Sequence, residues 1–203
     1  MKIICVGRNY GLHVAEMSSP VPEVPVLFLK PDSAILKNNK PFFLPDFSNN
    51  VQHEVEVVIK ICKLGKGISA KFAHRYYNEV TLGIDITARD IQERHKKGGL
   101  PWEISKGFDG SAPLGTFVPV KDIKDMSNLD FRLEINGKVV QKGNTSEMLF
   151  GFNEIIEYAS RFFTLKTGDL IFTGTPSGVG PLKKDDNLIA YLGDNPLLDF
   201  YIR

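Results

Sequence analysis

One stretch of this sequence is apolar enough for a buried strand yet carries two carboxylates, and this combination limits the folds it fits. Residues 55–61 are mostly valine and isoleucine, whose branched side chains favour a strand. Because side chains alternate along a strand, Glu54 and Glu56 point to one face, while Val55 and Val57 point to the other. Buried carboxylates need a cation. The pair therefore predicts either a site for magnesium or manganese or an edge strand whose glutamates face water.

Composition restricts the class of protein. The chain has 203 residues, 42% of them hydrophobic, and its 25 basic residues nearly balance 24 acidic ones. This describes an ordinary globular protein, and the net charge of +1 gives no indication of nucleic acid binding. No segment has the length of a membrane span or a signal sequence, so we expect a cytoplasmic protein without a membrane partner. Cys5 and Cys62 lie in apolar runs and are predicted to be buried, reduced thiols.

Alternating strand and turn signals predict a single domain over residues 1–203, of the α+β class and mainly β, with largely antiparallel strands. Asn136 and Gly137 form the strongest turn signal and predict a hairpin of residues 129–136 and 138–142. Apolar residues at helical spacing predict the longest helix over 147–163. Further strands are expected over 1–6, 26–30, 34–36, 42–44, 80–87, 169–173, 187–192 and 196–202, and short helices over 10–17, 70–77 and 88–97.

The short helix predicted near the N-terminus carries a candidate catalytic pair. His13 and Glu16 are three residues apart and share a helical face, where the carboxylate orients the imidazole and raises its basicity. Such a pair acts as a general base on water. A surface pair without a role is the alternative. Three prolines follow between residues 18 and 25 and predict an irregular segment, so we expect a mobile lid around residues 10–25.

A third acid interrupts another apolar stretch. Asp85 lies between two isoleucines, directly before a predicted helix. It is the natural third oxygen ligand beside Glu54 and Glu56, and an exposed position on its strand is the alternative. Asp90 has a sufficient structural explanation, because a negative charge is favoured at the start of a helix.

Basic side chains accompany these acids along the chain. Arg8, Arg89 and Lys106 are candidates to hold the carboxylate of a small anionic substrate. Each of them, taken alone, is equally explained as a solvated surface residue.

Together, these segments resemble the fumarylacetoacetate hydrolase family, in particular its short, single-domain branch of acylpyruvases and oxaloacetate-handling enzymes. The resemblance extends over nearly the whole chain and rests on the order of its motifs, since each motif alone is weak. The motifs are G-R-N-Y-x-x-H-x-x-E (7–16), V-L-F-L-K-P (26–31), H-E-V-E (53–56), G-I-D-I-T-A-R-D-I-Q (83–92), K-G-F-D-G-S-A-P-L-G (106–115), N-G-K-V-V-Q-K-G-N-T-S-E-M (136–148) and T-G-T-P-S-G-V-G (173–180).

The resemblance implies a fold and a metal site. The fold is the mixed β-sandwich or roll of the family's C-terminal domain, with a few helices. The resemblance also implies that Glu54, Glu56 and Asp85 bind Mg²⁺ or Mn²⁺, and that His13 and Glu16 lie on a lid that folds over the site.

The resemblance implies substrate contacts as well. Lys106 matches a lysine that contacts the substrate, a small anionic 2-oxo acid, and is expected to take part in catalysis. Gln92 and Thr175 match positions near the ligand, and Arg8 and Arg89 are further expected contacts. Members of the family are similar in forming homodimers, which we expect here too.

The activity expected from the resemblance is metal-dependent hydrolysis of a carbon–carbon bond in small acylpyruvates, which are 2,4-diketo acids, to pyruvate and a carboxylic acid. In this hypothesis Glu16 orients His13, and His13 removes a proton from the attacking water. Lys106 and the metal stabilise the negative charge of the departing pyruvate enolate. The larger fumarylacetoacetases have an additional N-terminal domain with no counterpart in this sequence, which favours the smaller substrates.

Other activities stay open at this point. The same enolate serves the decarboxylation or tautomerisation of oxaloacetate and the isomerisation of 2-hydroxyhepta-2,4-diene-1,7-dioate. A protein that binds 2-oxo acids without turnover and a β-rich scaffold with accidental acids are the two alternatives that are not enzymes.

Overall fold

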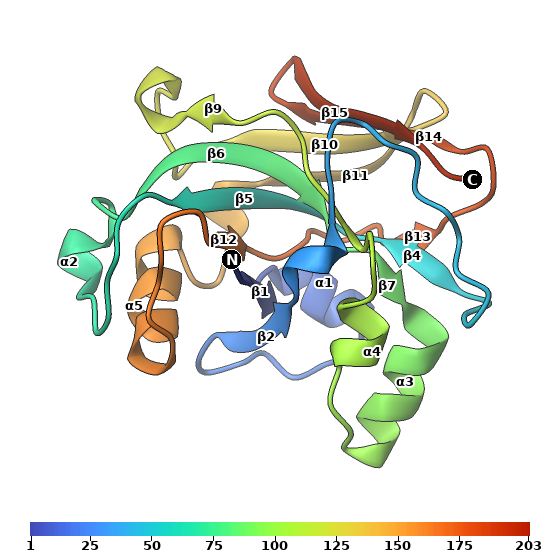
Figure 1. The fold of residues 1–203 in the computed structure, drawn as a ribbon, viewed down its shortest axis with the longest axis horizontal. Helices are drawn as coiled ribbons and strands as arrows, with labels where there is room; N and C mark the ends of the chain where they lie inside the picture. Colours follow the sequence, from blue (N-terminus) through green and yellow to red (C-terminus); the bar gives the residue numbers. More distant parts are fainter.

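The computed structural model describes residues 1–203 and is built around two large β-sheets (Figure 1). The larger sheet has six strands in the order β2-β1-β12-β5-β6-β9, and only its β1–β12 pair is parallel. The strand predicted over 26–30 is confirmed at both ends, whereas the strand expected to carry both glutamates begins at Val55, directly after Glu54. Its members are β1 (Ile3–Gly7), β2 (Val26–Lys30), β5 (Val55–Ile61), β6 (Tyr77–Ile84), β9 (Val118–Pro119) and β12 (Leu170–Phe172).

The second large sheet is antiparallel and has four strands in the order β11-β10-β14-β15. Asn136 and Gly137 connect β10 to β11 with φ angles of 52° and 75°, as a two-residue hairpin turn requires, so the predicted hairpin is confirmed. The strands of this sheet are β10 (Asp130–Ile135), β11 (Lys138–Asn144), β14 (Asn187–Leu192) and β15 (Asn195–Tyr201).

Two small sheets complete the β structure. One has the order β13-β4-β7 and the other pairs β3 with β8 in parallel. Their strands are β3 (Ile35–Leu36), β4 (Val51–His53), β7 (Thr87–Ala88), β8 (Ala112–Pro113) and β13 (Gly180–Pro181).

Apolar side chains hold the two large sheets together. Val55 and Val57 of β5 belong to the same buried cluster as Phe131 and Leu133 of β10. Val58, which points to the opposite face of β5, belongs to a second, smaller cluster with residues of β8 and β12. The six-stranded sheet is therefore covered on both faces, and the fold is mainly β, as predicted.

Five short helices lie around the sheets, and two of the predicted helices were too long. The helix predicted over 70–77 ends at Ala73, because Tyr77 pairs with Ile61 in the six-stranded sheet. The longest helix begins at Phe152, since residues 145–147 form a separate 3-10 turn that Asn144 caps. The helices are α1 (Gly11–Glu16), α2 (Ala70–Ala73), α3 (Arg89–Gly98), α4 (Glu103–Lys106) and α5 (Phe152–Phe162), and the 3-10 turns are Asp32–Ala34, Val120–Asp122 and Thr145–Glu147.

Three further predictions were wrong in detail. The strand expected over 42–44 is reduced to an isolated bridge between Phe42 and Ile202. The strand expected over 80–87 stops at Ile84, because the following residues turn away to join the small sheet through β7. Cys5 is buried, as predicted, but Cys62 follows the end of β5 and is partly exposed.

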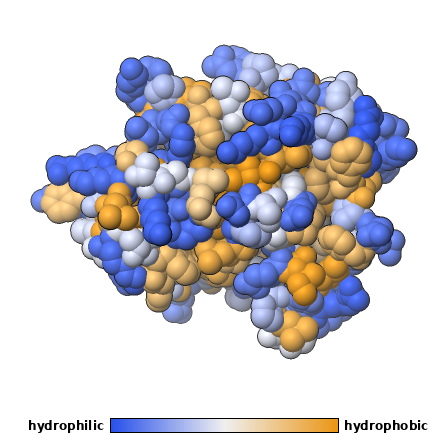
Figure 2. Space-filling view, in the orientation of Figure 1, coloured by the Kyte–Doolittle hydropathy of each residue, from blue (hydrophilic) through white to orange (hydrophobic).

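The surface is mixed in character. Figure 2 shows apolar surface, in orange, at the middle of this face, with hydrophilic surface around it. Exposed large apolar side chains include Leu12 in α1 and Ile104 in α4. None of the helices combines the length and the apolar character that crossing a bilayer requires.

Candidate active site

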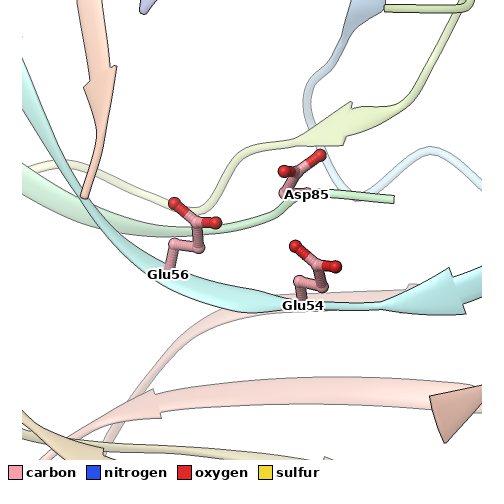
Figure 3. Close-up of side chains that lie close together, drawn as sticks. All are labelled: Glu54, Glu56 and Asp85. Carbon is pink, nitrogen blue, oxygen red and sulfur yellow. The ribbon is translucent and has the colours of Figure 1, made fainter. Parts of the chain in front are cut away.

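Three buried carboxylates converge where β5 and β6 pair (Figure 3). Glu54 directly precedes β5, Glu56 lies within it, and Asp85 directly follows β6. The backbone N–H of Asp85 donates to the carbonyl of Glu54 at 2.8 Å, so the strand pairing itself positions both acids. Carboxylate oxygens of the three residues lie within 4.8 Å of one another. Each residue is at most 5% exposed, which excludes the alternative that these acids face water.

Three buried cations contact two of these acids. Lys106 Nζ lies 2.8 Å from Glu54 Oε2 and 2.7 Å from Asp85 Oδ2, so it bridges two candidate ligands. Lys30 Nζ lies 2.7 Å from Asp85 Oδ1, and Arg89 forms an ion pair with Glu54 Oε1. A buried charge is tolerated only when it is paired in this way.

Glu56 is the acid of the cluster that no cation contacts. It accepts a hydrogen bond of 2.7 Å from the backbone N–H of Gly174. Burial, together with the charges of Asp85 and Glu54, raises the pKa of Glu56 well above its ordinary value. Burial also acts to raise the pKa of Glu54, but the two cations beside that carboxylate hold its pKa well below the usual range.

The donor set of the three acids fits a hard divalent cation. All the ligand atoms are carboxylate oxygens, which magnesium and manganese prefer, whereas zinc sites favour nitrogen and sulfur. Glu56 has no positive partner of its own, and a bound cation supplies one. The fit of Mg²⁺ or Mn²⁺ therefore follows from the chemistry of the residues present.

Helix α1 carries the predicted histidine and glutamate beside this cluster. His13 Nδ1 lies 3.1 Å from Glu16 Oε2. Because a carboxylate only accepts hydrogen bonds, Glu16 holds the imidazole proton on Nδ1 and leaves Nε2 free. Glu16 Oε1 also accepts a hydrogen bond of 3.0 Å from the backbone N–H of Gly178. A Cβ on Gly178 would lie 2.4 Å from the carbonyl oxygen of Val140, so this close approach requires glycine.

A pocket joins the acids to α1, α3 and α4, and only four of its 16 lining residues are hydrophobic. It brings together every site residue predicted from the sequence except Glu16, which contacts the pocket-lining imidazole of His13. The predicted residues that line it are Arg8, His13, Glu54, Glu56, Asp85, Arg89, Gln92, Lys106 and Thr175.

The guanidinium group of Arg89 donates more hydrogen bonds within the protein than we expected for a residue that contacts the substrate. Its Nε donates to Gln52 Oε1 at 2.8 Å, and its Nη1 donates to Gln92 Oε1 at 2.6 Å. Its Nη2 donates to Glu54. Each guanidinium nitrogen therefore has an acceptor within the protein, and these contacts orient Glu54 and Gln92.

Sequence reasoning missed three residues of the site. Lys30 ends a strand predicted correctly, and a lysine in an otherwise apolar strand was the available signal. Lys96 lies four residues after Gln92, and that helical spacing alone would have placed it beside the pocket. Gln141 lies between exposed lysines of the hairpin and gives no such signal.

Gln141 connects the four-stranded sheet to the site. Its Oε1 accepts hydrogen bonds from His53 Nδ1 at 2.9 Å and from the backbone N–H of Val55 at 3.0 Å. Its Nε2 donates to Thr175 Oγ1 at 2.9 Å and to the carbonyl of Pro176 at 3.0 Å. One buried side chain therefore fixes the strand that carries the two glutamates and the loop that carries Thr175.

Comparison with known proteins agrees with this arrangement. Residues 2–198 match the family model described as fumarylacetoacetate (FAA) hydrolase C-terminal. The chain therefore belongs to the fumarylacetoacetate hydrolase family. Within this family, the mitochondrial oxaloacetate tautomerase FAHD1 of Bos taurus is 45% identical over 188 residues, which are 93% of this chain and 85% of that protein.

Two other members of the fumarylacetoacetate hydrolase family show the range of its chemistry. The mitochondrial oxaloacetate decarboxylase of Dictyostelium discoideum is 44% identical over 183 residues, which are 90% of this chain and 84% of that protein. The crystal structure of fumarylpyruvate hydrolase from Pseudomonas aeruginosa in complex with Mn²⁺ and pyruvate has a TM-score of 0.94 and 33% identity. It covers 100% of this chain and 89% of that one. The predicted family and fold are thus confirmed.

Proposed function

We propose that this protein is a Mg²⁺- or Mn²⁺-dependent enzyme that converts small 2-oxo acids through their enolates, with the keto–enol tautomerisation of oxaloacetate as its main reaction. The observation that carries the proposal is the place of His13, which is 7% exposed and lines the pocket of the three buried acids. Tautomerisation moves one proton between oxygen and carbon and consumes no water, so a pocket with one buried proton-transfer group meets its needs. The similarity to oxaloacetate tautomerase FAHD1 supports this choice of substrate.

Each side chain of the pocket has a defined role in this proposal. The metal, when bound, supplies Lewis acidity toward the 2-oxo group of the substrate. His13 accepts the proton of the enol hydroxyl group through Nε2 and delivers a proton to the neighbouring carbon, which restores its own protonation state. Glu16 keeps the imidazole in the required orientation. Lys106 places its ammonium group where negative charge develops on the enolate oxygen.

Hydrolysis of acylpyruvates, the activity expected from the sequence, is the second candidate. The His13–Glu16 pair favours it, because a pair of this kind also activates water. The similarity to fumarylpyruvate hydrolase supports it as well. In this reaction His13 takes a proton from water, and the water oxygen attacks the distal carbonyl. The carbon–carbon bond then breaks to release the acid and the enolate of pyruvate, whose carbon takes the proton from His13.

One set of assays separates these reactions. The enol form of oxaloacetate is mixed with the protein, with Mg²⁺, with Mn²⁺ or with a chelator, and the loss of enol absorbance is followed. Pyruvate release from oxaloacetate reports decarboxylation, and the loss of acetylpyruvate or fumarylpyruvate reports hydrolysis. We expect metal-dependent loss of the enol without matching pyruvate release, and in His13→Ala a rate lower by about 10²-fold to 10⁴-fold.

The assay also defines what would overturn the proposal. If the enol disappears no faster than in buffer while acylpyruvates are consumed, hydrolysis is the function. If His13→Ala retains full activity toward every substrate, the assignment of the proton-transfer group is wrong.

The proposal includes two expectations about the protein in the cell. We propose a homodimer and a cytoplasmic location, as expected from the family resemblance and the sequence. Exposed apolar side chains such as Phe43 and Phe47 support an interface between subunits. Sedimentation of the purified protein tests the dimer, and fractionation of the source cells tests the location.

A further inference from the structure

Lys96 presents a charge to the pocket from the far end of α3. Arg89, Gln92 and Lys96 are spaced three and four residues apart, so they lie on one face of this helix, and all three line the pocket. The first two contact each other beside Glu54, at the end of the pocket that holds the acids. Lys96 lies one turn further along the helix.

Two aromatic rings separate Lys96 from the acids. Phe28 and Trp102 both line the pocket, and their ring centroids are 5.7 Å apart. Lys106 Nζ, at the acid end, lies 5.3 Å from the Phe28 ring, and Lys96 Nζ lies 5.5 Å from the Trp102 ring. The Phe28 and Trp102 rings, tilted by 58° to each other, thus lie between Lys106 at the acid end of the pocket and Lys96.

The two lysines differ in their partners. Lys106 forms ion pairs with both Glu54 and Asp85, so its charge is neutralised within the protein. No carboxylate lies within ion-pairing distance of Lys96, although its side chain is only partly exposed. Burial, and then the positive charges of Arg89 and Lys106, lower the pKa of Lys96 to about 8. A cation in this setting is stabilised by an anionic ligand.

We propose that Lys96 binds the substrate carboxylate that is remote from the three acids and so makes the pocket selective for 2-oxo dicarboxylic acids. This inference rests on the proposed function, because it takes the 2-oxo acid end of the substrate to lie at the acid cluster. The flat chain of a short diacid then lies along Phe28 and Trp102, with its second carboxylate at Lys96. A 2-oxo monoacid such as pyruvate fills the acid end alone and leaves Lys96 without a partner.

The test compares the binding of a diacid and a monoacid and does not require turnover. The Mg²⁺-loaded protein is titrated by calorimetry at low temperature with freshly dissolved oxaloacetate, which heating would decarboxylate to pyruvate, or with pyruvate, and the titration gives the affinity for each. We expect wild type to bind oxaloacetate more tightly than pyruvate. Lys96→Met keeps the apolar stem on Trp102 but removes the charge, and it should weaken oxaloacetate binding about tenfold to a hundredfold and leave pyruvate binding unchanged.

Two further variants make the result specific. Lys97→Met removes the charge of the next residue, which is exposed and lies outside the pocket, and should have no effect on either ligand. Lys96→Arg should restore most of the preference for the diacid.

Three results would overturn the inference. The first is that wild type binds oxaloacetate and pyruvate with equal affinity. The second is that Lys96→Met keeps the preference for oxaloacetate, and the third is that this variant loses affinity equally for both ligands. If the preference for oxaloacetate depends on Lys96 but no reaction is catalysed, the inference stands and the proposed function fails.

Discussion

Glu16 Oε1 accepts a hydrogen bond from the backbone N–H of Gly178 while Glu16 Oε2 contacts the imidazole of His13. One carboxylate therefore both orients the candidate proton-transfer group and fastens helix α1 to the loop after β12. We therefore predict that closure of the lid expected around residues 10–25 and alignment of His13 are coupled through this side chain.

Two substitutions of Glu16 separate these effects. Glu16→Gln keeps an acceptor for Gly178 but loses the charge beside His13, so we expect slower catalysis, by up to the roughly 10²-fold of a weak general base, with α1 still protected from hydrogen exchange. Glu16→Ala loses both contacts and should show the same slow catalysis together with faster exchange in α1. Exchange mass spectrometry and kcat measurements check this. Equal exchange in the two variants would show that the Gly178 contact does not hold the lid.

Lys30 is expected to contribute to the stability of the folded protein as well as to the site. Its ammonium group pairs with Asp85 and also donates to the carbonyl of Ser111 at 2.9 Å. Lys30→Met removes the cation beside Asp85 Oδ1 and leaves Lys106 as the only cation paired with that carboxylate, so it should lower the free energy of unfolding by up to about 3–5 kcal/mol. Urea denaturation measures the change. Because Lys30 and Asp85 interact directly, the combination with Asp85→Asn should cost less than the sum of the single changes, and strict additivity would contradict the pairing.

Gln141 is predicted to be a positioning residue. Gln141→Leu leaves the backbone N–H of Val55 and the carbonyl of Pro176 without partners, at about 1–3 kcal/mol for each buried group. Unfolding by urea should show this loss, and Mg²⁺ should raise the Tm less than in wild type because Val55 separates the two glutamates. Lys142→Leu, at an exposed position of the same strand, is the control. A normal Mg²⁺ response in folded Gln141→Leu would limit its role to stability.

Metal binding should depend on pH through Glu56. Burial and the neighbouring acids raise the pKa of this carboxyl group well above 4.5, so the metal-free protein retains a proton there that the unfolded chain loses. The metal-free protein should therefore lose stability as pH rises above 4.5 toward the folded pKa. A divalent cation must displace the proton, so its affinity should increase with pH over the same range.

Calorimetry at about pH 6 in two buffers of different ionisation enthalpy measures the protons released by Mg²⁺. Glu56→Gln should bind the metal more weakly and release no proton. Equal heats in the two buffers for wild type would show that Glu56 is already ionised in the metal-free protein.

Selectivity for diacids should fall at alkaline pH. Burial and the cations of Arg89, Lys106 and Arg8 lower the pKa of Lys96 to about 8, against the opposite effect of Glu54. Lys96 therefore loses its charge as pH rises through about 8, and KM for oxaloacetate should rise there. Lys96→Arg, whose guanidinium stays protonated, should remove this dependence. A rise of KM that persists in Lys96→Arg would assign it to another group.

The sequence was sufficient for the elements whose signals are local. Strand β5 was predicted from its branched residues, and the hairpin from Asn136 and Gly137. Tyr77 was placed in a helix because its helical neighbours were visible, whereas its strand partner, Ile61, lies far away in the chain.

The residues of the candidate site also divide into those with a local sequence signal and those without one. Glu54, Glu56 and Asp85 were identified because a charge in an apolar strand is visible within a few residues. The cations that pair with Glu54 and Asp85 come from β2, α3 and α4, and their pairing depends on packing between distant segments. Gln141 was missed because no local pattern encodes its contacts, and Lys30 was missed although a lysine in an apolar strand was a signal.

The register in which β5 pairs with β6 positions the carboxylates of the site as well as the apolar side chains of the core. Glu56 lies opposite Gly83, and Glu54 bonds to the residue that follows β6. A shift of β5 by one residue would turn Val55 and Val57 out of the main core and push both carboxylates into it. Misaligned chains therefore carry two buried charges without partners, so the acids that serve the site also penalise the wrong pairing during folding.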